Sequence, residues 1–314
     1  MKKLIYLLII LSSCSGLLNA QTVDTPAIKK IPTLNGHTFL STSYLQSSFV
    51  ATSLQADIGI GSTSTLKIPG IIIDDYEILS FEGKLLFVDL NVQYQQRFNP
   101  WLALFISAKM AGRLGTDMSS IMADGVNTIV GGNIGWLVRI KQTDKLNLSG
   151  TVSLNNITGN FINVTKYFDE IINNEPYPSV IKKVPAMTAG IGFRGAYAFS
   201  PTFGLQFNLD YAYGESLERG ASKAYFSGGI LGDVDFNPKY KVPVGLALGY
   251  SMSSAPEIVM NDGGFSNLFL GKIGYTGSQD FELGVQYTYY NVDLKSVNDK
   301  PFISKIMLTL KFYF

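Results

Sequence analysis

Cysteine and histidine are almost missing from this 314-residue chain, which contains one of each, Cys14 and His37. Single copies exclude Cys/His zinc sites and a framework of disulfide bonds. His37 also lies beside no Ser or Asp motif in the sequence that would complete a hydrolytic site. We therefore expect no metal ion, no cofactor and no enzymatic activity.

Charge and long apolar runs are scarce as well. Charged residues make up 16% of the chain, and the net charge is only +1, so no basic excess points to a nucleic-acid partner. After residue 20, no segment is apolar for the roughly 20 residues that a membrane-spanning helix needs. Hydrophobic residues nevertheless amount to 46%. A chain this apolar can enter a membrane without spanning helices only as a closed β-barrel, because lipid cannot satisfy free backbone groups.

The N-terminus has the pattern of an export signal. Lys2 and Lys3 precede an apolar run over residues 4–11, and the small residue Ala20 offers a cleavage site before Gln21. We interpret residues 1–20 as a signal peptide. The alternative is lipidation at Cys14, because the residues that end in this cysteine resemble the lipobox of bacterial lipoproteins.

Most of the remaining chain alternates with a period of two residues. Over residues 203–214, apolar side chains such as Phe203 and Tyr211 occupy one face, and polar ones such as Gln206 and Asp210 the other. Side chains alternate across a strand in this way. The pattern predicts strands over 54–62, 83–98, 101–112, 133–142, 145–156, 186–199, 203–214, 224–236, 242–252, 265–276, 281–290 and 302–314. Most of these are about ten residues long, whereas strands of a soluble β-sandwich average nearer five or six.

Short and long connections alternate between these strands. The short ones contain residues that favour tight turns and lie at 99–100, 143–144, 200–202, 237–238 and 277–278. Outer-membrane barrels have short periplasmic turns and longer outer loops. We therefore predict an all-β fold in which residues 53–314 form an antiparallel up-and-down transmembrane β-barrel of about twelve strands, with fourteen as the alternative. Residues 21–52 would form a periplasmic or lumen-inserted segment.

Two of the long connections have helical periodicity instead. Val164, Tyr167, Phe168, Ile171 and Ile172 follow the spacing of an amphipathic helix, and residues 119–130 show a similar pattern. We expect helices there that either cap the pore or pack on the barrel rim.

The last predicted strand carries a family resemblance. Ile306, Leu308, Leu310, Phe312 and Phe314 alternate with more polar neighbours, and the strand ends on an aromatic residue. Together with the signal peptide and the alternating strands, this pattern resembles the bacterial outer-membrane β-barrel proteins, without pointing to a subfamily. The resemblance implies a location in the outer membrane and contact with outer-membrane lipid. It also implies that the barrel-assembly machinery recognises the terminal strand, with Phe312 and Phe314 as the signal.

The alternation also places charged side chains inside the predicted barrel. Those on inward faces are Asp57, Asp89, Arg97, Lys109, Arg139, Arg194, Asp210, Lys272, Glu282 and Lys311. Unpaired charges are costly in so narrow a space, so we expect them to form ion pairs. Either the charges brace and block the barrel, or they line a pore and set its selectivity. Six basic residues against four acidic ones favour a mild preference for anions.

Two functions from different classes fit these features. Twelve strands can enclose a narrow passage, so we predict a channel or transporter for small polar or amphipathic solutes whose identity the sequence does not reveal. The alternative is a non-conducting structural or assembly component of the cell envelope.

Overall fold

The structure is a computed structural model of the chain. It describes residues 31–73, 76–115, 125–162, 164–173, 175–216, 222–254, 265–291 and 302–314. The predicted signal peptide, the proposed lipidation site at Cys14 and residues 119–124 of the second predicted helix lie outside these residues.

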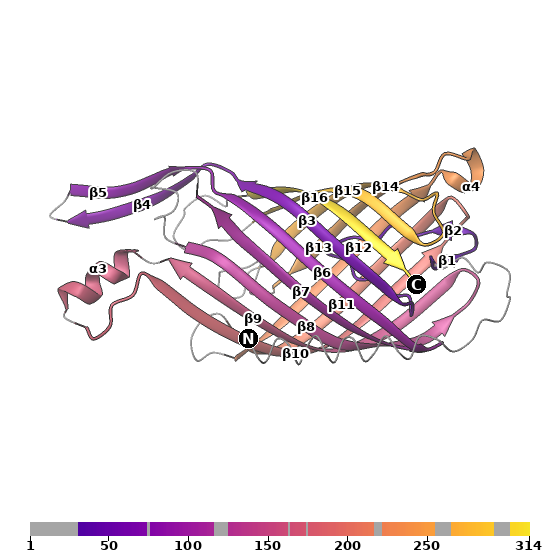
Figure 1. Ribbon diagram of the computed structural model, residues 1–314, viewed down its shortest axis with the longest axis horizontal. Coiled ribbons are helices and arrows are strands. Elements are labelled where there is room, and N and C mark those ends of the chain that lie inside the picture. The colour runs from indigo at the N-terminus through magenta and orange to yellow at the C-terminus, as the bar shows by residue number, and fades with distance from the viewer. Residues whose placement is uncertain are drawn as a thin grey trace.

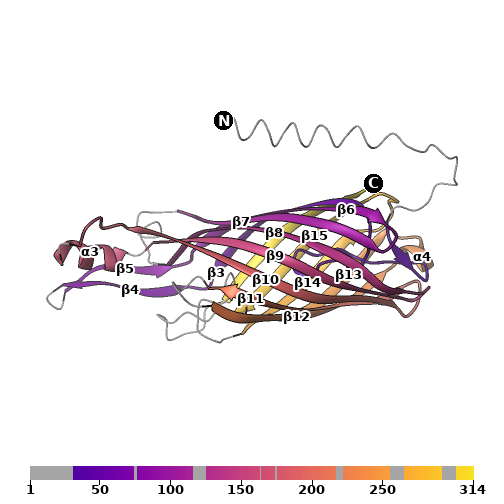
Figure 2. The same cartoon turned by 90° about the horizontal axis from the view of Figure 1, so that it is seen from below.

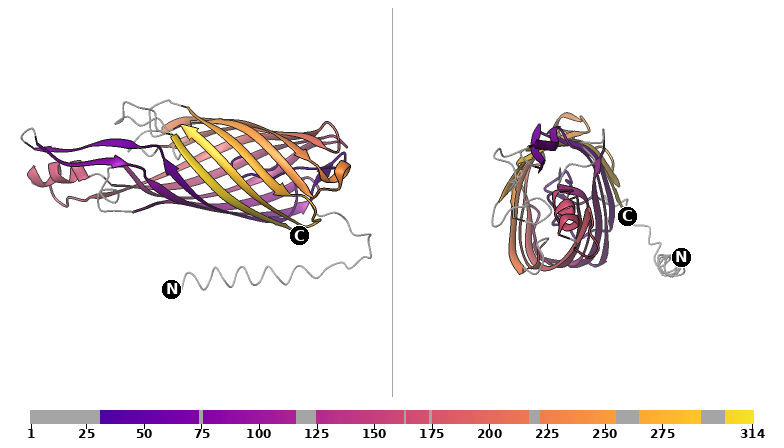
Figure 3. Two further views of the ribbon diagram at one scale, coloured as in Figure 1. Left: turned by 90° about the horizontal axis from the view of Figure 1, so that it is seen from above. Right: turned by 90° about the vertical axis from the view of Figure 1, so that its left-hand side faces the viewer.

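Twelve antiparallel strands close into one barrel, which confirms the predicted architecture and strand number. The strands are β3 (Ser53–Thr63), β6 (Leu86–Asn99), β7 (Leu102–Leu114), β8 (Gly125–Gln142), β9 (Leu146–Ile162), β10 (Ile181–Ala198), β11 (Phe203–Glu215), β12 (Ser222–Asp235), β13 (Val244–Ser253), β14 (Ser266–Tyr275), β15 (Phe281–Asn291) and β16 (Phe302–Tyr313). Each pairs with its neighbour in this order, and β16 returns to pair with β3 (Figures 1 and 3). Closure gives every strand of the ring a hydrogen-bonded neighbour on both sides, as lipid requires.

Polar residues fill the inside of the barrel, and apolar residues cover its outside. On β3 the side chain of Asp57 faces the lumen and is 0% exposed, whereas its neighbour Ile58 faces outward and is 57% exposed. On β16 Thr309 is buried and Leu308 is exposed in the same way. An apolar surface this broad would drive aggregation in water, so the pattern is typical of a wall that faces lipid.

Aromatic side chains mark both edges of the apolar surface. Phe281 packs against Phe312 at one end of β15 and β16, with ring centroids 6.4 Å apart. Tyr289 packs against Phe302 at the other end of the same strands, with a separation of 5.0 Å. Outer-membrane barrels carry such aromatic girdles at the two membrane interfaces.

The short connections lie together at one end of the barrel, which we call the turn end. Four of the five have the predicted short form, but the connection from β12 to β13 contains α4 (Asn237–Tyr240), so β13 begins at Val244 and not at residue 242. A proline lies in the first turn of α4, where its missing N–H costs no hydrogen bond. Lys241 ends the helix with a φ of 58°. The Asn-Pro pair thus starts a helical turn where a two-residue turn was predicted.

The opposite end, which we call the loop end, carries the longer connections. The sequence predicted a loop between β3 and β6, but β4 (Leu66–Ile73) and β5 (Tyr76–Gly83) form a two-stranded sheet there. This sheet projects beyond the barrel, as does α3 (Val164–Ile172), which confirms the first predicted helix (Figures 1 and 2). Lys182 donates a hydrogen bond to Glu170 of α3 at 2.7 Å and lowers the pKa of that carboxyl group.

The second predicted helix is wrong where the structure describes it. Residues 125–130 belong to β8, which pairs with β9 from Gly125 and Ile162 onward. Ile129 and Val130 are β-branched and favour an extended backbone when a neighbouring strand supplies its hydrogen bonds. Pairing between distant segments therefore overrides the local helical spacing. In the part of the chain that the structure describes, no helix is both long enough and apolar enough to cross a membrane.

We expect the terminal strand to be required for insertion. β16 closes the barrel by pairing with both β15 and β3, and the N–H of Phe314 donates to the Thr52 carbonyl at 3.1 Å. Deletion of residues 312–314 removes this contact and the aromatic pair with Phe281, so most of the protein should be lost from the outer-membrane fraction and should lose heat-modifiable migration on gels. Phe302→Ala, at the other end of the same strand, serves as the control and should insert normally. Equal insertion of both variants would contradict the prediction.

Candidate functional site

Residues 31–52, which we call the plug, lie inside the barrel toward its turn end. The plug begins with a small hairpin of β1 (Thr33–Leu34) and β2 (His37–Thr38), whose turn residues Asn35 and Gly36 both have positive φ. Such an Asn-Gly pair is the preferred sequence of a two-residue hairpin turn. Residues 39–52 then follow the lumen to the start of β3 without forming a helix or a strand.

Apolar side chains of the plug pack against apolar side chains of the barrel wall. They form three buried clusters: Leu40 and Leu45 with Leu231, Ala247, Leu268, Leu270 and Tyr290; Leu34, Phe39 and Phe49 with Ala196 and Ala198; and Val50 with Ala103, Phe105 and Leu137. Burial of a large apolar side chain contributes roughly 1.5–3 kcal/mol. These clusters therefore hold the plug in place and fill this part of the lumen.

His37 joins the start of the plug to the wall. Its buried ring bonds through Nε2 to Asp233 of β12, and its Nδ1 lies 3.3 Å from the carbonyl oxygen of Pro201. Gln206 donates to the other oxygen of Asp233 at 3.1 Å. The ring is thus held between a side chain of β12 and the backbone of the turn before β11. The sequence shows no Asp beside His37, but the fold brings one from 196 positions away.

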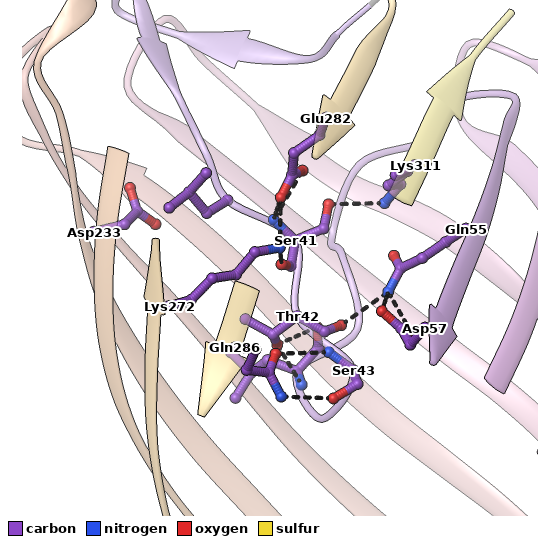
Figure 4. Close-up of polar contacts among 12 residues, drawn as sticks. Ser41, Thr42, Ser43, Gln55, Asp57, Asp233, Lys272, Glu282, Gln286 and Lys311 are labelled. Carbon is purple, nitrogen blue, oxygen red and sulfur yellow. Dashed lines mark hydrogen bonds and ion pairs between the residues drawn. The ribbon is translucent and has the colours of Figure 1, made fainter. Parts of the chain in front are cut away.

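Ser41 contacts charged side chains from three strands (Figure 4). Glu282 of β15 accepts from its backbone N–H at 3.0 Å, and Lys272 of β14 donates to its carbonyl oxygen. Lys311 of β16 donates to its hydroxyl at 3.1 Å. Lys272 and Glu282 also form an ion pair of 2.7 Å. These buried charges therefore have partners, which offsets the cost of removing them from water.

Neutral side chains bind the backbone of the plug elsewhere. Gln206 and Gln55 donate to the carbonyl oxygens of Leu40 and Thr42 at 2.9 and 3.2 Å. On other strands, Asn147 and Ser149 both donate to Ser48 O at 2.6 Å, and Gln95 donates to Phe49 O and Ala51 O at 2.8 Å. Buried backbone groups need hydrogen-bond partners, and here the wall supplies them because residues 39–52 join no sheet.

The ten charged residues that the sequence places on inward faces lie at different levels of the barrel. Asp57, Arg194, Lys272, Glu282 and Lys311 are buried at the level of the plug. Asp89, Lys109 and Asp210 lie nearer the loop end, and Arg97 and Arg139 lie near the turn end. Arg194 bonds to the side chain of Gln46 and lies over the ring of Phe105, with 5.1 Å from Cζ to the centroid.

Sequence analysis missed six further charged residues on inward faces, Arg113, Lys182, Lys223, Asp233, Asp235 and Lys305. Lys305 forms an ion pair of 2.8 Å with Asp89. It is in phase with Lys311 on the last strand, so the alternation could have revealed it. Asp233 and Asp235 were harder to place because the glycines of β12 blur its two faces. Among the described residues, no group of three or more His, Cys, Asp or Glu side chains is placed to bind a metal ion.

We expect Gly204 of β11 to be required for seating the plug. A Cβ atom there would collide with the ring of His37 and lie 2.7 Å from Phe39. Gly204→Val should therefore displace the plug and accelerate amide hydrogen exchange over residues 37–50, while the barrel strands stay protected. Mass spectrometry measures this exchange. Gly232→Val, where a Cβ would have no neighbour within 4 Å, is the control. Unchanged exchange over residues 37–50 in Gly204→Val would refute this role.

Comparison with known proteins shows which class of fold the chain has. No protein-family model and no curated protein matches the chain. The translocator domain of the autotransporter NalP from Neisseria meningitidis is 11% identical, with 86% of this chain and 90% of that chain covered and a TM-score of 0.50. A NanC porin is 7% identical, with coverages of 82% and 100% and a TM-score of 0.47. A FadL homologue from Pseudomonas aeruginosa is 11% identical, with coverages of 84% and 90% and a TM-score of 0.41. At these identities the likeness concerns the fold alone, and the chain has the twelve-stranded form of the bacterial outer-membrane β-barrel fold.

Proposed function

We propose that the protein is a channel or transporter of the bacterial outer membrane for small polar or amphipathic solutes, and that the plug closes it. In this arrangement the turn end faces the periplasm, and the loop end faces the cell exterior. Outer-membrane lipid surrounds the apolar surface of the wall, and the barrel-assembly machinery inserts the protein by recognising β16.

The observation that carries this proposal is the way in which the plug is held. Residues 39–52 contact the wall through apolar side chains and through hydrogen bonds from wall side chains, and they pair with no strand of the barrel. Exchanging such a hydrogen bond for one to water costs about 0.5–1.5 kcal/mol net. A segment held in this way can leave while the closed wall stays intact. The passage that it would uncover is lined by polar and charged side chains, which suit a polar or amphipathic solute.

We further propose that the protein is not an enzyme. The position of His37, the one histidine of the chain, supports this. Both of its ring nitrogens face acceptors, Asp233 and the carbonyl oxygen of Pro201, so the ring is not free to take a proton from a serine.

A non-conducting structural component is the second candidate. The observation that favours it is the filling of the turn-end half of the lumen by the plug and by paired charges such as Lys272 and Glu282. In that case the plug would stay in place, and the buried ion pairs would brace the wall. The two candidates differ in whether the barrel conducts.

Cross-linking the plug to the wall separates the two candidates. A Cβ atom on Gly36 would lie 3.6 Å from the Cβ of Pro201, within the range of a disulfide bond. We expect the double variant Gly36→Cys/Pro201→Cys to show no channel events in planar bilayers when oxidised, and to conduct after reduction. The reason is that only the reduced form can release the plug.

The single variant Gly36→Cys is the control for this experiment. Gly36 has a φ of 77°, so a cysteine there costs roughly 1–2 kcal/mol whether or not a disulfide forms. The conductance of the single variant should not depend on the reductant. Absence of channel events and of solute uptake into liposomes in both the oxidised and the reduced double variant would favour the structural candidate.

The open lumen should prefer anions mildly. The six inward-facing charges that sequence analysis missed are four basic and two acidic residues, so the excess of positive charges rises from two to four. Lys109→Glu halves this excess and should shift the reversal potential under a salt gradient toward cation preference. Lys239→Glu, on the exposed helix α4, makes the same charge change outside the lumen and should leave the potential unaltered. A clear cation preference of the unaltered protein would contradict the prediction.

A further inference from the structure

The barrel wall contacts the backbone of the plug at many positions. Seven carbonyl oxygens of the plug accept hydrogen bonds from wall side chains: those of Leu40, Ser41, Thr42, Ser47, Ser48, Phe49 and Ala51. Two backbone N–H groups, those of Ser41 and Ser43, donate to Glu282 and Gln286. Backbone groups are common to all peptides. The wall is therefore complementary to a polypeptide that is extended on either side of a bend at residues 43–45, largely independently of its sequence.

The side chains that make these contacts come from several sides of the lumen. Lys272 and Glu282 reach the plug from β14 and β15 and bind Ser41 (Figure 4). Gln206 of β11 binds the neighbouring carbonyl oxygen of Leu40. Asn147 of β9 and Gln95 of β6 bind the stretch from Ser48 to Ala51. Most of these side chains are long amides or charged groups that can follow a shifted backbone by rotating about several bonds. Their arrangement suits a site for an extended chain that crosses the lumen.

The wall also leaves room for the side chains of such a chain. Gly229 and Gly274 lie opposite side chains of the plug, which are Leu45 and Leu40 respectively. A Cβ atom on each glycine would lie only 2.6–2.8 Å from the nearest atom of these side chains. The missing Cβ atoms thus form recesses that accept large apolar side chains. A ligand with apolar residues at intervals along its backbone would fill the same recesses.

We propose that the lumen binds extended oligopeptides in the place that the plug occupies, and that the plug is the tethered occupant of this peptide site. This names the substrate class of the proposed transporter and rests on that function, because the plug must leave before another peptide can enter. The contacts span residues 40–51, so peptides of comparable length match the site. A tethered segment competes at an effective concentration in the mM range, so a free peptide binds measurably only when the plug is weakened.

The test uses the full-length protein with Gly204→Val, which weakens the plug without altering any of its residues. The probe is a fluorescent peptide with the sequence of residues 40–51, which lacks the Phe39 side chain that faces position 204, and a second peptide has the same residues in reverse order. A labelled polyethylene glycol of similar length, which has no amide groups, is the control ligand. We expect both peptides to bind saturably in fluorescence anisotropy with affinities within about threefold of each other, because each wall side chain contributes only modestly to a backbone contact. The polyether should not bind.

Variants of wall residues, and the disulfide bond between the plug and the wall, provide further tests of peptide binding. Gln95→Leu in the Gly204→Val background removes the donor to two carbonyl oxygens and should weaken peptide binding roughly tenfold. Gln93→Leu, on the same face of β6, is the matched control, because Gln93 makes no hydrogen bond to the plug among the described residues. In the same Gly204→Val background, the oxidised Gly36→Cys/Pro201→Cys variant should bind neither peptide, and reduction should allow both to bind.

Each outcome separates this inference from the proposed function. If Gly204→Val conducts ions but binds neither peptide, the peptide site is refuted and the channel stands. Binding of only one peptide order, or equal binding of the polyether, also refutes recognition through the backbone. If both peptides bind but no variant conducts, the site is supported and the channel function fails.

Discussion

Backbone amides that are buried away from water need hydrogen-bond partners, and this requirement shapes both the wall and the plug. The wall meets it by pairing twelve strands around a closed ring, so each strand has a neighbour on both sides. The plug runs through the lumen without a strand partner, and side chains of the wall supply its hydrogen bonds instead. The ring can open only by breaking many backbone bonds together, whereas the plug can exchange its bonds one at a time. The difference supports the proposal that the plug can leave while the wall stays closed.

The second constraint is the width of the lumen. A barrel of twelve strands is wider than one of eight, whose interior side chains alone can fill, and its lumen holds the plug as well as inward-facing side chains. Inward-facing glycines create additional space where long side chains or the plug approach the wall. Gly59 lies opposite Met307, Gly61 opposite Lys305, and Gly284 opposite Lys272, at distances where a Cβ atom would be 2.5–2.6 Å from the facing side chain. The glycines relieve crowding on the inner surface, and the plug occupies much of what remains at the turn end.

The charged residues divide according to their distance from the turn end. Those near the plug, such as Lys272 and Glu282, bind each other and the plug backbone, so they fasten the plug as well as brace the wall. Nearer the loop end, Asp89 pairs with Lys305, and Lys109 lies on the same inward face of the barrel. The lumenal charges can therefore brace the barrel at the level of the plug and line the passage nearer the loop end, so the two roles do not exclude each other. The prediction that lumenal charges set selectivity remains to be tested by measurements of ion flow.

The amino-acid sequence by itself determined the wall of this protein. Alternation with period two is a local property, so it predicted the twelve strands, and it also showed that Asp57 faces inward while Ile58 faces outward. The local pattern did not predict the secondary structure where a distant segment supplies the hydrogen bonds. Residues 125–130 have helical spacing, but they extend β8 because β9 pairs with them. The tertiary structure alone decided the contacts of the plug. His37 meets Asp233 across 196 positions, and Ser41 meets Lys272, Glu282 and Lys311 only because barrel closure brings three late strands around an early segment.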